Sequence, residues 1–463
     1  MVTKNIPEVR SERRYYLDWL RVLAVFVVLL QHSVIIPSSL FFESEAFSLV
    51  LAPVGALGPA GITVFFLVSG ASSIFALDRR TSWQYVKERT LRLAVPYIVF
   101  SLLNTPYVVW LLARTGDYNE YLTEVFGASK AAQLQGSSLW EFYPLFYQDV
   151  LGGLLSGSAA SPVWIGWFGL HLWFIGFLFL FSVLGLPLLQ WLRSDSARAF
   201  IEFAVRVATG PFGLVLFAIP VVILGLIGDF IAVDVGYPGY QGWGAFLRYF
   251  AIFLLGALLY CDSRLLDAVR RYWPIVLAVG IVAVGVHFYL EFSVELSATS
   301  YYLSGASGGV MEWCLAVALL RMGMAVLNRN GNALQYCLGI VVAFYVLHWP
   351  VETTIAYWLT QSSVTLAFIW DVTFLDWLFG TLLSIVLLLA VIEFIVRPIP
   401  PLRFLLGVPK ERIPGRKKTG DQPEPVAADS VPSNTDHPTT PEGADGKTAV
   451  VQNRHEHTDK DAP

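Results

Sequence analysis

The chain has 463 residues, of which 56% are hydrophobic and only 14% are charged. Soluble domains average about 45–50% apolar and about 25% charged residues, so this composition excludes an ordinary soluble globular protein. Only three cysteines are present, which excludes a disulfide-built secreted domain. The formal net charge of −4 indicates little about partners, because the positions of the charges carry more information than their sum.

Apolar segments long enough to cross a bilayer recur along the chain. A transmembrane helix needs about 20 apolar residues. Ten segments qualify, near residues 17–37, 52–77, 93–113, 163–190, 210–232, 243–261, 273–292, 307–327, 334–358 and 370–396. We therefore expect an all-α fold, a polytopic membrane bundle of about ten transmembrane helices. The first segment has no convincing small-residue cleavage site, so we interpret it as a retained helix and not a signal peptide.

The Lys and Arg residues predict that both termini are cytoplasmic. Nineteen of them fall in segments assigned to the inside, whereas the outer loops hold only Arg114 and Lys130. We expect a multi-pass protein of the cell (inner or plasma) membrane. Its predicted parts are a cytoplasmic arm at 1–14, an integral membrane domain at 15–408 and a disordered cytoplasmic tail at 409–463.

Two segments outside the apolar core have their own composition. The longest outer loop, near residues 114–162, is acidic and aromatic, and its length predicts structure or function of its own. The tail has no Trp, Tyr or Phe after Phe404 and is rich in Pro, Asp and Thr, which is typical of disorder.

The first apolar segment contains three ionisable residues of interest. Arg21 and His32 are eleven residues apart, which places both on one helix face about 16 Å apart along the axis. Asp18 precedes Arg21 by three residues and can pair with it. One interpretation is that this helix face binds an anionic donor at its cytoplasmic end and that His32 acts as a base in the outer half of the membrane. The alternative is an Arg that reaches the interface and a core His that bonds a backbone carbonyl.

Two further motifs lie toward the cytoplasmic side. Arg89 and Arg92 project from neighbouring positions of one helix face, and guanidinium pairs suit phosphates. The alternative is that they only signal topology by their positive charge. In the second segment, the small residues around Ser69 and Gly70 allow close helix approach, and packing is the simpler interpretation.

Three histidines lie at similar depth on three different segments: His32, His171 and His348. Trp173 and Tyr345 stand beside the latter two in sequence. Depth alone does not bring them together, and no metal-ligand spacing is present, so we expect a shared polar cavity and no metal.

These residues together resemble the acyltransferase-3 family of integral membrane acyltransferases. Tyr16-Leu17-Asp18 followed by Arg21 and His32 is similar to the signature of that family's first helix. Further motifs follow in the family's order: Phe65-Phe66-Leu67-Val68-Ser69-Gly70, Arg89-x-x-Arg92, His171-Leu172-Trp173-Phe174 and Tyr345-Val346-Leu347-His348-Trp349-Pro350. The segments at 171–174 and 392–407 resemble the branch that contains glucan biosynthesis protein C, a branch associated with succinyl transfer.

The resemblance implies an enzyme that transfers acyl groups other than aminoacyl groups. Acyl-CoA would be a cytoplasmic co-substrate with no tightly bound cofactor, and an acetyl- or succinyl-class group would pass to a hydroxyl of an extracytoplasmic glycan or glycolipid. His32, Arg21 and Asp18 would form the catalytic group, and Arg89, Arg92 and Arg21 would hold the coenzyme. His171, Trp173, Tyr345, His348 and Ser69 are carried as cavity residues.

Two other classes of function remain open from composition. A transporter or flippase of a glycan or lipid intermediate also has many spans with buried charges, although no inverted repeat is visible. A structural or sensing scaffold leaves the depth-matched histidines unexplained. If the protein is this enzyme, its expected partners are acyl-CoA, the acceptor and the lipid bilayer, and no nucleic acid. Whether it forms a homo-oligomer stays open.

Overall fold

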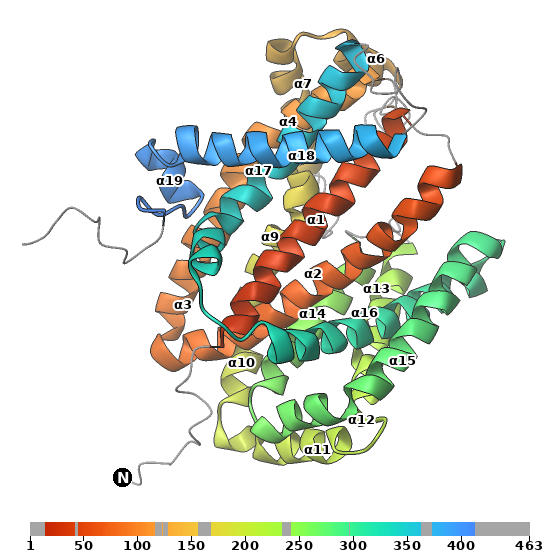
Figure 1. The fold of residues 1–463 in the computed structure, drawn as a ribbon, viewed down its shortest axis with the longest axis vertical. Coiled ribbons are helices and arrows are strands. Elements are labelled where there is room, and N and C mark those ends of the chain that lie inside the picture. Colours follow the sequence, from red (N-terminus) through yellow and green to blue (C-terminus); the bar gives the residue numbers. More distant parts are fainter. Residues whose placement is uncertain are drawn as a thin grey trace, which may run out of the picture. The chain divides into compact units, whose positions relative to one another are not determined.

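The computed structural model describes residues 14–41, 45–115, 123, 128–155, 168–233, 242–295, 297–362 and 373–412. Within these residues every regular element is helical and there is no strand (Figure 1). The longer helices are α1 (Tyr15–Phe41), α2 (Glu45–Arg79), α4 (Val95–Thr115), α7 (Leu139–Leu155), α9 (Trp173–Leu184), α11 (Arg198–Ala208), α13 (Ala218–Val233), α14 (Trp243–Leu259), α15 (Ser263–Ser293), α16 (Ala298–Val326), α17 (Asn332–Ser362) and α18 (Thr373–Val391). The shorter ones are α3 (Ser82–Arg89), α6 (Ala128–Gly136), α10 (Leu186–Leu192), α12 (Gly213–Leu216) and α19 (Pro400–Leu405), with π-helical turns η2 (Thr90–Ala94) and η6 (Ile392–Val396) and 3₁₀ turns η3 (Leu170–Leu172) and η4 (Asp195–Ala197).

The apolar segments expected from the sequence are present as helices. In the described residues, eight helices are long and apolar enough to cross a membrane, from Tyr15–Ser33 to Trp377–Val396. A ninth candidate is the pair Leu170–Leu184 and Leu186–Leu192, which is bent by 54°. The sixth predicted segment is α14, a shorter apolar helix of 17 residues. The all-α polytopic bundle is confirmed, whereas the cytoplasmic placement of both termini stays a prediction.

Local sequence sets several helix boundaries. Thr81 caps α3 in a capping box with Gln84. Asp262 caps α15, because its carboxylate accepts a hydrogen bond of 2.8 Å from the backbone N–H of Arg264. The Arg264 guanidinium also donates to this carboxylate and holds the pKa of Asp262 below its usual value. The bend between α9 and α10 falls at Gly185 and Pro187, residues that interrupt a helix.

Helix α2 lies at the centre of the bundle, packed against α1, α14 and α16. Close approach to α14 depends on two glycines. A Cβ at Gly70 would lie 1.8 Å from the carbonyl oxygen of Phe253, and a Cβ at Gly256 would lie 2.1 Å from that of Leu67. The packing interpretation of the small residues in the second segment is therefore correct for Gly70.

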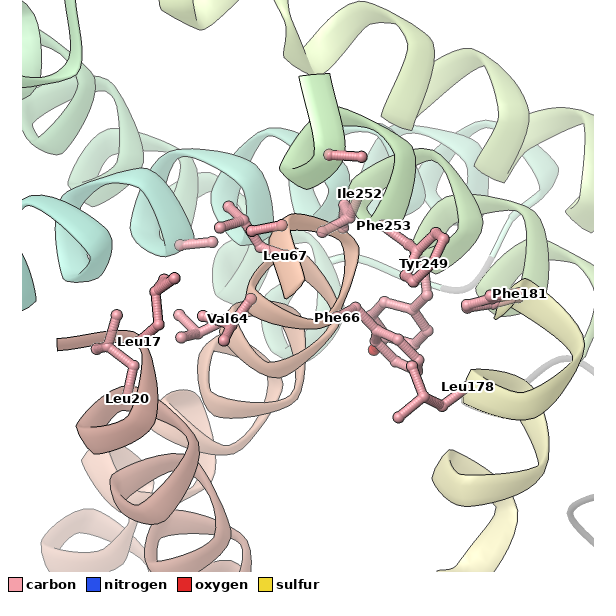
Figure 2. Close-up of a cluster of buried hydrophobic side chains, with 14 of the residues drawn as sticks. Leu17, Leu20, Val64, Phe66, Leu67, Leu178, Phe181, Tyr249, Ile252 and Phe253 are labelled. Carbon is pink, nitrogen blue, oxygen red and sulfur yellow. The ribbon is translucent and has the colours of Figure 1, made fainter. Parts of the chain in front are cut away.

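Aromatic side chains fill the space between α2, α9 and α14. The ring of Phe66 lies 4.9 Å from that of Tyr249 and 5.2 Å from that of Phe181, and all three side chains are buried (Figure 2). The ring of Trp173 lies 5.9 Å from that of Tyr249 and 6.4 Å from that of Phe66, so it joins the same cluster. This packing fixes α9 against the central helices and so positions the residues at its start.

The long loop predicted to face outward contains two helices, α6 and α7, which pack on α4. Pro106 in α4 has no N–H, so the carbonyl four residues earlier, at Leu102, lacks its helical donor. The hydroxyl of Tyr147 donates to that carbonyl, and Tyr143 donates to the carbonyl of Leu103. The expectation that this loop has structure of its own is confirmed for residues 128–155.

At the other end of the described chain, Arg397 holds the start of the predicted tail. Its guanidinium pairs with Glu393 at 2.8 Å and donates to the carbonyl of Pro409 at 2.6 Å. Residues 409–412 therefore contact the helical bundle, and the rest of the predicted tail lies outside the described residues.

Candidate active site

Three histidines from three helices converge in the bundle. His32 of α1 and His348 of α17 lie with ring centroids 5.0 Å apart, and the ring of His171 in η3 lies 5.2 Å from that of His348. Trp349 borders the group, with its ring 4.3 Å from that of His32. The structure thus brings the three histidine rings together, and that they share a polar cavity stays a prediction.

Hydrogen bonds determine which nitrogen of His32 is basic. The carbonyl of Tyr345 can only accept, so His348 donates to it through Nδ1–H and carries its lone pair on Nε2. The Nδ1–H of His32 then donates to that Nε2 across 2.8 Å. In the neutral ring, Nε2 of His32 is left with a lone pair that can accept a proton.

His171 faces the group with an acceptor. Its Nε2–H donates to the carbonyl of Val346 at 3.0 Å, which leaves the lone pair on Nδ1. That Nδ1 is buried and has no hydrogen-bond partner among the described residues. Within the part of the chain that the structure describes, the Trp349 indole N–H and both carboxyl oxygens of Glu352 are also buried without partners. Leaving such a group unpaired costs about 1–3 kcal/mol, so this site suits polar partners such as water or a substrate.

Glu352 raises the question of a metal. One ligand atom each from His32, His348 and Glu352 lie within 4.8 Å of one another. Two nitrogens bound to one tetrahedral zinc at about 2.0–2.1 Å would stand about 3.3 Å apart. The 2.8 Å separation between His32 and His348 is that of a hydrogen bond. The two rings are thus arranged to bond each other.

A pocket opens beside His32 and encloses about 360 Å³ of empty space, part of it open to the outside. Val25, Val28 and His32 line it from α1, at positions that continue the helical stripe begun by Arg21. The other lining residues come from α2, η3, α9 and α17: Gly61, Ile62, Phe65, His171, Trp173, Phe174 and Tyr345. The pocket therefore lies along the face of α1 that joins Arg21 to His32.

The turn that carries His171 has a strained backbone. Leu170 has a φ of 46°, in the left-handed region that costs a non-glycine residue roughly 1–2 kcal/mol. The turn is held by the Tyr345 hydroxyl, which donates to the carbonyl of His171. Strain of this kind is typical of functional sites, and here it orients His171 toward His348.

Toward the end predicted to be cytoplasmic, Arg21 forms the pair expected from its spacing. Its guanidinium contacts Asp18 at 3.0 Å and also donates to the hydroxyl of Ser72 in α2. The neighbouring serine, Ser73, accepts from Arg89 at 3.4 Å. Two arginines from separate helices thus contact adjacent residues of α2.

Arg89 and Arg92 have different surroundings. Arg89 lies over the buried ring of Tyr85, with its guanidinium carbon 5.0 Å from the ring centre. Arg92 has 76% of its side chain exposed and pairs with Glu88 at 3.3 Å. A π-helical turn, η2, starts directly after Arg89, so the two residues are not related by ordinary α-helical spacing.

Comparison with known proteins gives one match. The sequence profile of the acyltransferase-3 family, described as an acyltransferase domain, matches residues 14–393. The chain belongs to the acyltransferase-3 family. No curated protein and no solved structure matches it. Membership, together with the apolar helices, makes the chain a multi-pass membrane acyltransferase.

In this acyltransferase-3 protein, the predicted cavity residues fall into two groups. His171, Trp173 and Tyr345 line the pocket beside His32, and His348 supports His32 from behind. Ser69 lies elsewhere: among the described residues it is not part of the pocket wall, and its backbone carbonyl accepts from Ser73. The roles assigned to all these residues stay predictions.

Sequence reasoning gave no role to Trp349, Ser72 and Ser73. In the sequence, Trp349 is only one residue of an aromatic motif. Its contact with His32 depends on how α1 and α17 pack, so the structure is needed to find it. The two serines follow Gly70 in an apolar helix, where small residues usually mean packing. The position of Glu352 could be inferred from the sequence, because it lies four residues after His348 and so shares a helix face with it.

Proposed function

We propose that the protein transfers an acyl group from cytoplasmic acyl-CoA to a hydroxyl of an extracytoplasmic glycan or glycolipid, in the cell membrane. The observation that carries this proposal is the hydrogen-bonded His32–His348 pair beside an apolar pocket, in a chain of the acyltransferase-3 family. A base beside an apolar pocket whose wall follows α1 from Val25 to His32 suits a long thin donor such as acyl-pantetheine.

The coenzyme would bind at the end that carries Arg21 and Arg89. Guanidinium groups suit phosphates through paired hydrogen bonds. Both arginines contact adjacent serines of α2 and are thereby oriented. Arg92, being exposed, would add a peripheral charge. The pantetheine arm would then follow the stripe through Val25 and Val28 to His32.

The transfer step uses Nε2 of His32 as a general base. Nε2 takes the proton of the acceptor hydroxyl while the oxygen attacks the thioester carbonyl. The C–O bond forms, the C–S bond breaks, and the coenzyme thiolate leaves with the electron pair. The proton on His32 is then available to that thiolate, so the histidine returns to its neutral form. Asp18 does not contact the reacting atoms in this scheme. It pairs with Arg21 and holds the guanidinium in place.

The test is acyl transfer by purified protein with acyl-CoA and a glycan acceptor. His32→Ala should lower kcat by about 10²–10⁴-fold, the usual contribution of a positioned base. Arg89→Ala should weaken acyl-CoA binding instead. His287→Ala is the matched control, since His287 lies on α15 and contacts Ser304, away from this site. Full activity of His32→Ala would overturn the mechanism, and acceptor movement without CoA would favour a transporter.

A further inference from the structure

We infer that Trp349 and Glu352 bind the acceptor through a second hydroxyl, next to the one that reacts, so that the preferred acceptors are vicinal diols. This inference rests on the proposed function and specifies the acceptor side of its site. It follows from where the two residues stand along α17 and from the hydrogen bonds that their side chains lack within the described chain.

Helices α1 and α17 run in the same direction, which separates the two sides of His32. Near the start of α1, the indole N–H of Trp19 donates to the carbonyl of Arg329, just before α17 begins, at 3.1 Å. Further along both helices, His32 donates to His348. Glu352 follows His348 by about one helical turn, so it stands roughly 6 Å further from the end proposed to bind the coenzyme.

The pocket beside His32 lies on the donor side of that histidine. Its wall from α1 ends at His32, and its lining residue from α17, Tyr345, precedes His348. Among the described residues of α17, none that follows His348 lines this pocket. A donor that fills the pocket therefore leaves the part of α17 beyond His348 to the acceptor.

Two buried polar groups beyond His348 lack partners among the described residues. The indole N–H of Trp349 is buried, and the ring that carries it lies 4.3 Å from the ring of His32. The Glu352 carboxyl belongs to a residue that is 4% exposed, and one of its oxygens lies within 4.8 Å of ring nitrogens of His32 and His348. Trp349 and Glu352 are three residues apart on α17, so their side chains are neighbours on its surface.

These two groups offer one hydrogen-bond donor and one acceptor. An indole N–H only donates, and a carboxyl group accepts a hydrogen bond in either protonation state. A hydroxyl donates one hydrogen bond and accepts others, so a single hydroxyl can satisfy both groups. A hydrogen atom in its place would satisfy neither and would leave two buried polar groups unpaired.

The hydroxyl bound by this pair differs from the one that reacts. The reacting hydroxyl gives its proton to Nε2 of His32 in the proposed transfer step, so its own hydrogen bond is already used. Because Glu352 lies within 4.8 Å of the histidine pair, the second hydroxyl belongs on a neighbouring carbon. Acceptors with two adjacent hydroxyls therefore fit this side of His32 better than acceptors with one.

The experiment uses acetyl-CoA as donor and compares 1,2-octanediol with 1-octanol as acceptors for the purified full-length protein in lipid nanodiscs. Both alcohols have the same chain and the same primary hydroxyl, so the ratio of their kcat/KM values isolates the neighbouring hydroxyl. We expect the diol to exceed octanol by at least about 10-fold, because octanol leaves the buried groups unpaired.

The outcomes separate this inference from the proposed function. Equal kcat/KM values for the two alcohols would mean that the two groups bind water only, which would overturn the inference and leave the proposed function intact. Octyl glucoside serves as a third acceptor. Transfer to the glucoside and to neither alcohol would also overturn the inference, whereas transfer to none of the three would count against the proposed function itself.

Two variants distinguish acceptor binding from a structural role. Trp349→Phe keeps a ring against His32 but removes the N–H, and Glu352→Ala removes the carboxyl group. Each should lower kcat/KM for the diol several-fold and bring the ratio toward one, with octanol transfer and the KM for acetyl-CoA unchanged. Glu352→Gln keeps an acceptor oxygen and should retain most of the preference for the diol.

Trp358→Phe is the matched control for the tryptophan variant. It makes the same change on the same helix at an exposed position, so the ratio of the wild type should be kept. Equal losses with both alcohols in Trp349→Phe and Glu352→Ala would assign these residues to packing and would overturn the inference.

Discussion

The basic nitrogen of His32 is defined by a residue 316 positions away. The periodicity of one helix was enough to place Arg21 and His32 on a common face, because that relation is local. It could not place His348 against His32, because lateral neighbours depend on how α1 and α17 pack. The candidate base was therefore predictable from sequence, and its hydrogen-bond partner was not.

His348 is accordingly a positioning residue, and its replacement should change catalysis without weakening donor binding. His348→Asn removes the acceptor that orients the His32 ring. We expect kcat to fall by roughly 10²-fold, part of the contribution of a positioned base, with KM for acyl-CoA unchanged. The pH profile of kcat should also shift, because the neighbour of the base has changed. A variant that loses activity only through lower thermal stability, with the original pH profile, would argue for a structural role.

Chelation tests the competing use of His32, His348 and Glu352 as metal ligands. With His32 bonded directly to His348, activity should be unchanged after treatment with EDTA and dialysis. Metal analysis of the purified protein should find less than one equivalent. Loss of activity with EDTA and recovery on adding Zn²⁺ would instead assign the three side chains to a metal site.

At the scale of elements, the contact between α2 and α14 depends on the absence of a side chain. Gly70→Ala would place a methyl group 1.8 Å from the carbonyl oxygen of Phe253, so the helices must separate. Overpacking of this kind costs about 1–3 kcal/mol. Gly285→Ala in α15 is the control, since a Cβ there meets nothing within 4 Å. In detergent, the midpoint temperature of thermal unfolding should fall for Gly70→Ala and should stay unchanged or rise for Gly285→Ala. Equal shifts in the two variants would contradict the close contact between α2 and α14.

The start of α15 offers a pH-dependent test. Asp262→Asn keeps a side-chain acceptor for the helix cap but removes the charge that faces Arg264. The pKa of Asp262 is lowered in the folded protein, so its charge stabilises the fold above the unfolded pKa of about 3.9 and loses this effect as pH falls through the folded value. The stability difference between the two proteins should be constant from pH 7 to pH 5 and shrink below pH 4. A difference independent of pH would show that the charge contributes nothing.

For the whole molecule, hydropathy predicted where the apolar helices lie better than how they bend. All ten predicted segments contain apolar helix, because length and composition are properties of the segment itself. The 54° bend falls at Gly185 and Pro187, a local sequence signal that hydropathy does not weigh. The π-helical turn after Arg89 and the strained Leu170 were not predictable, because they depend on tertiary packing, and both adjoin a candidate site residue.

The orientation of the molecule decides whether donor and acceptor approach from opposite sides, as the proposed reaction requires. Trp83 in α3, near Arg89, is 73% exposed, and Trp140 in α7, which packs on α4, is 84% exposed. In a background with Cys261 and Cys337 replaced by serine, Trp83→Cys and Trp140→Cys should react with a membrane-impermeant maleimide from opposite faces of sealed vesicles. Cys314 is buried and should not react. The face that labels Trp83→Cys should also be the one where added acyl-CoA supports transfer. Labelling of both positions from one face would mean that the Arg89 end and the α7 end are not separated by the membrane, and the two-sided reaction would have to be abandoned.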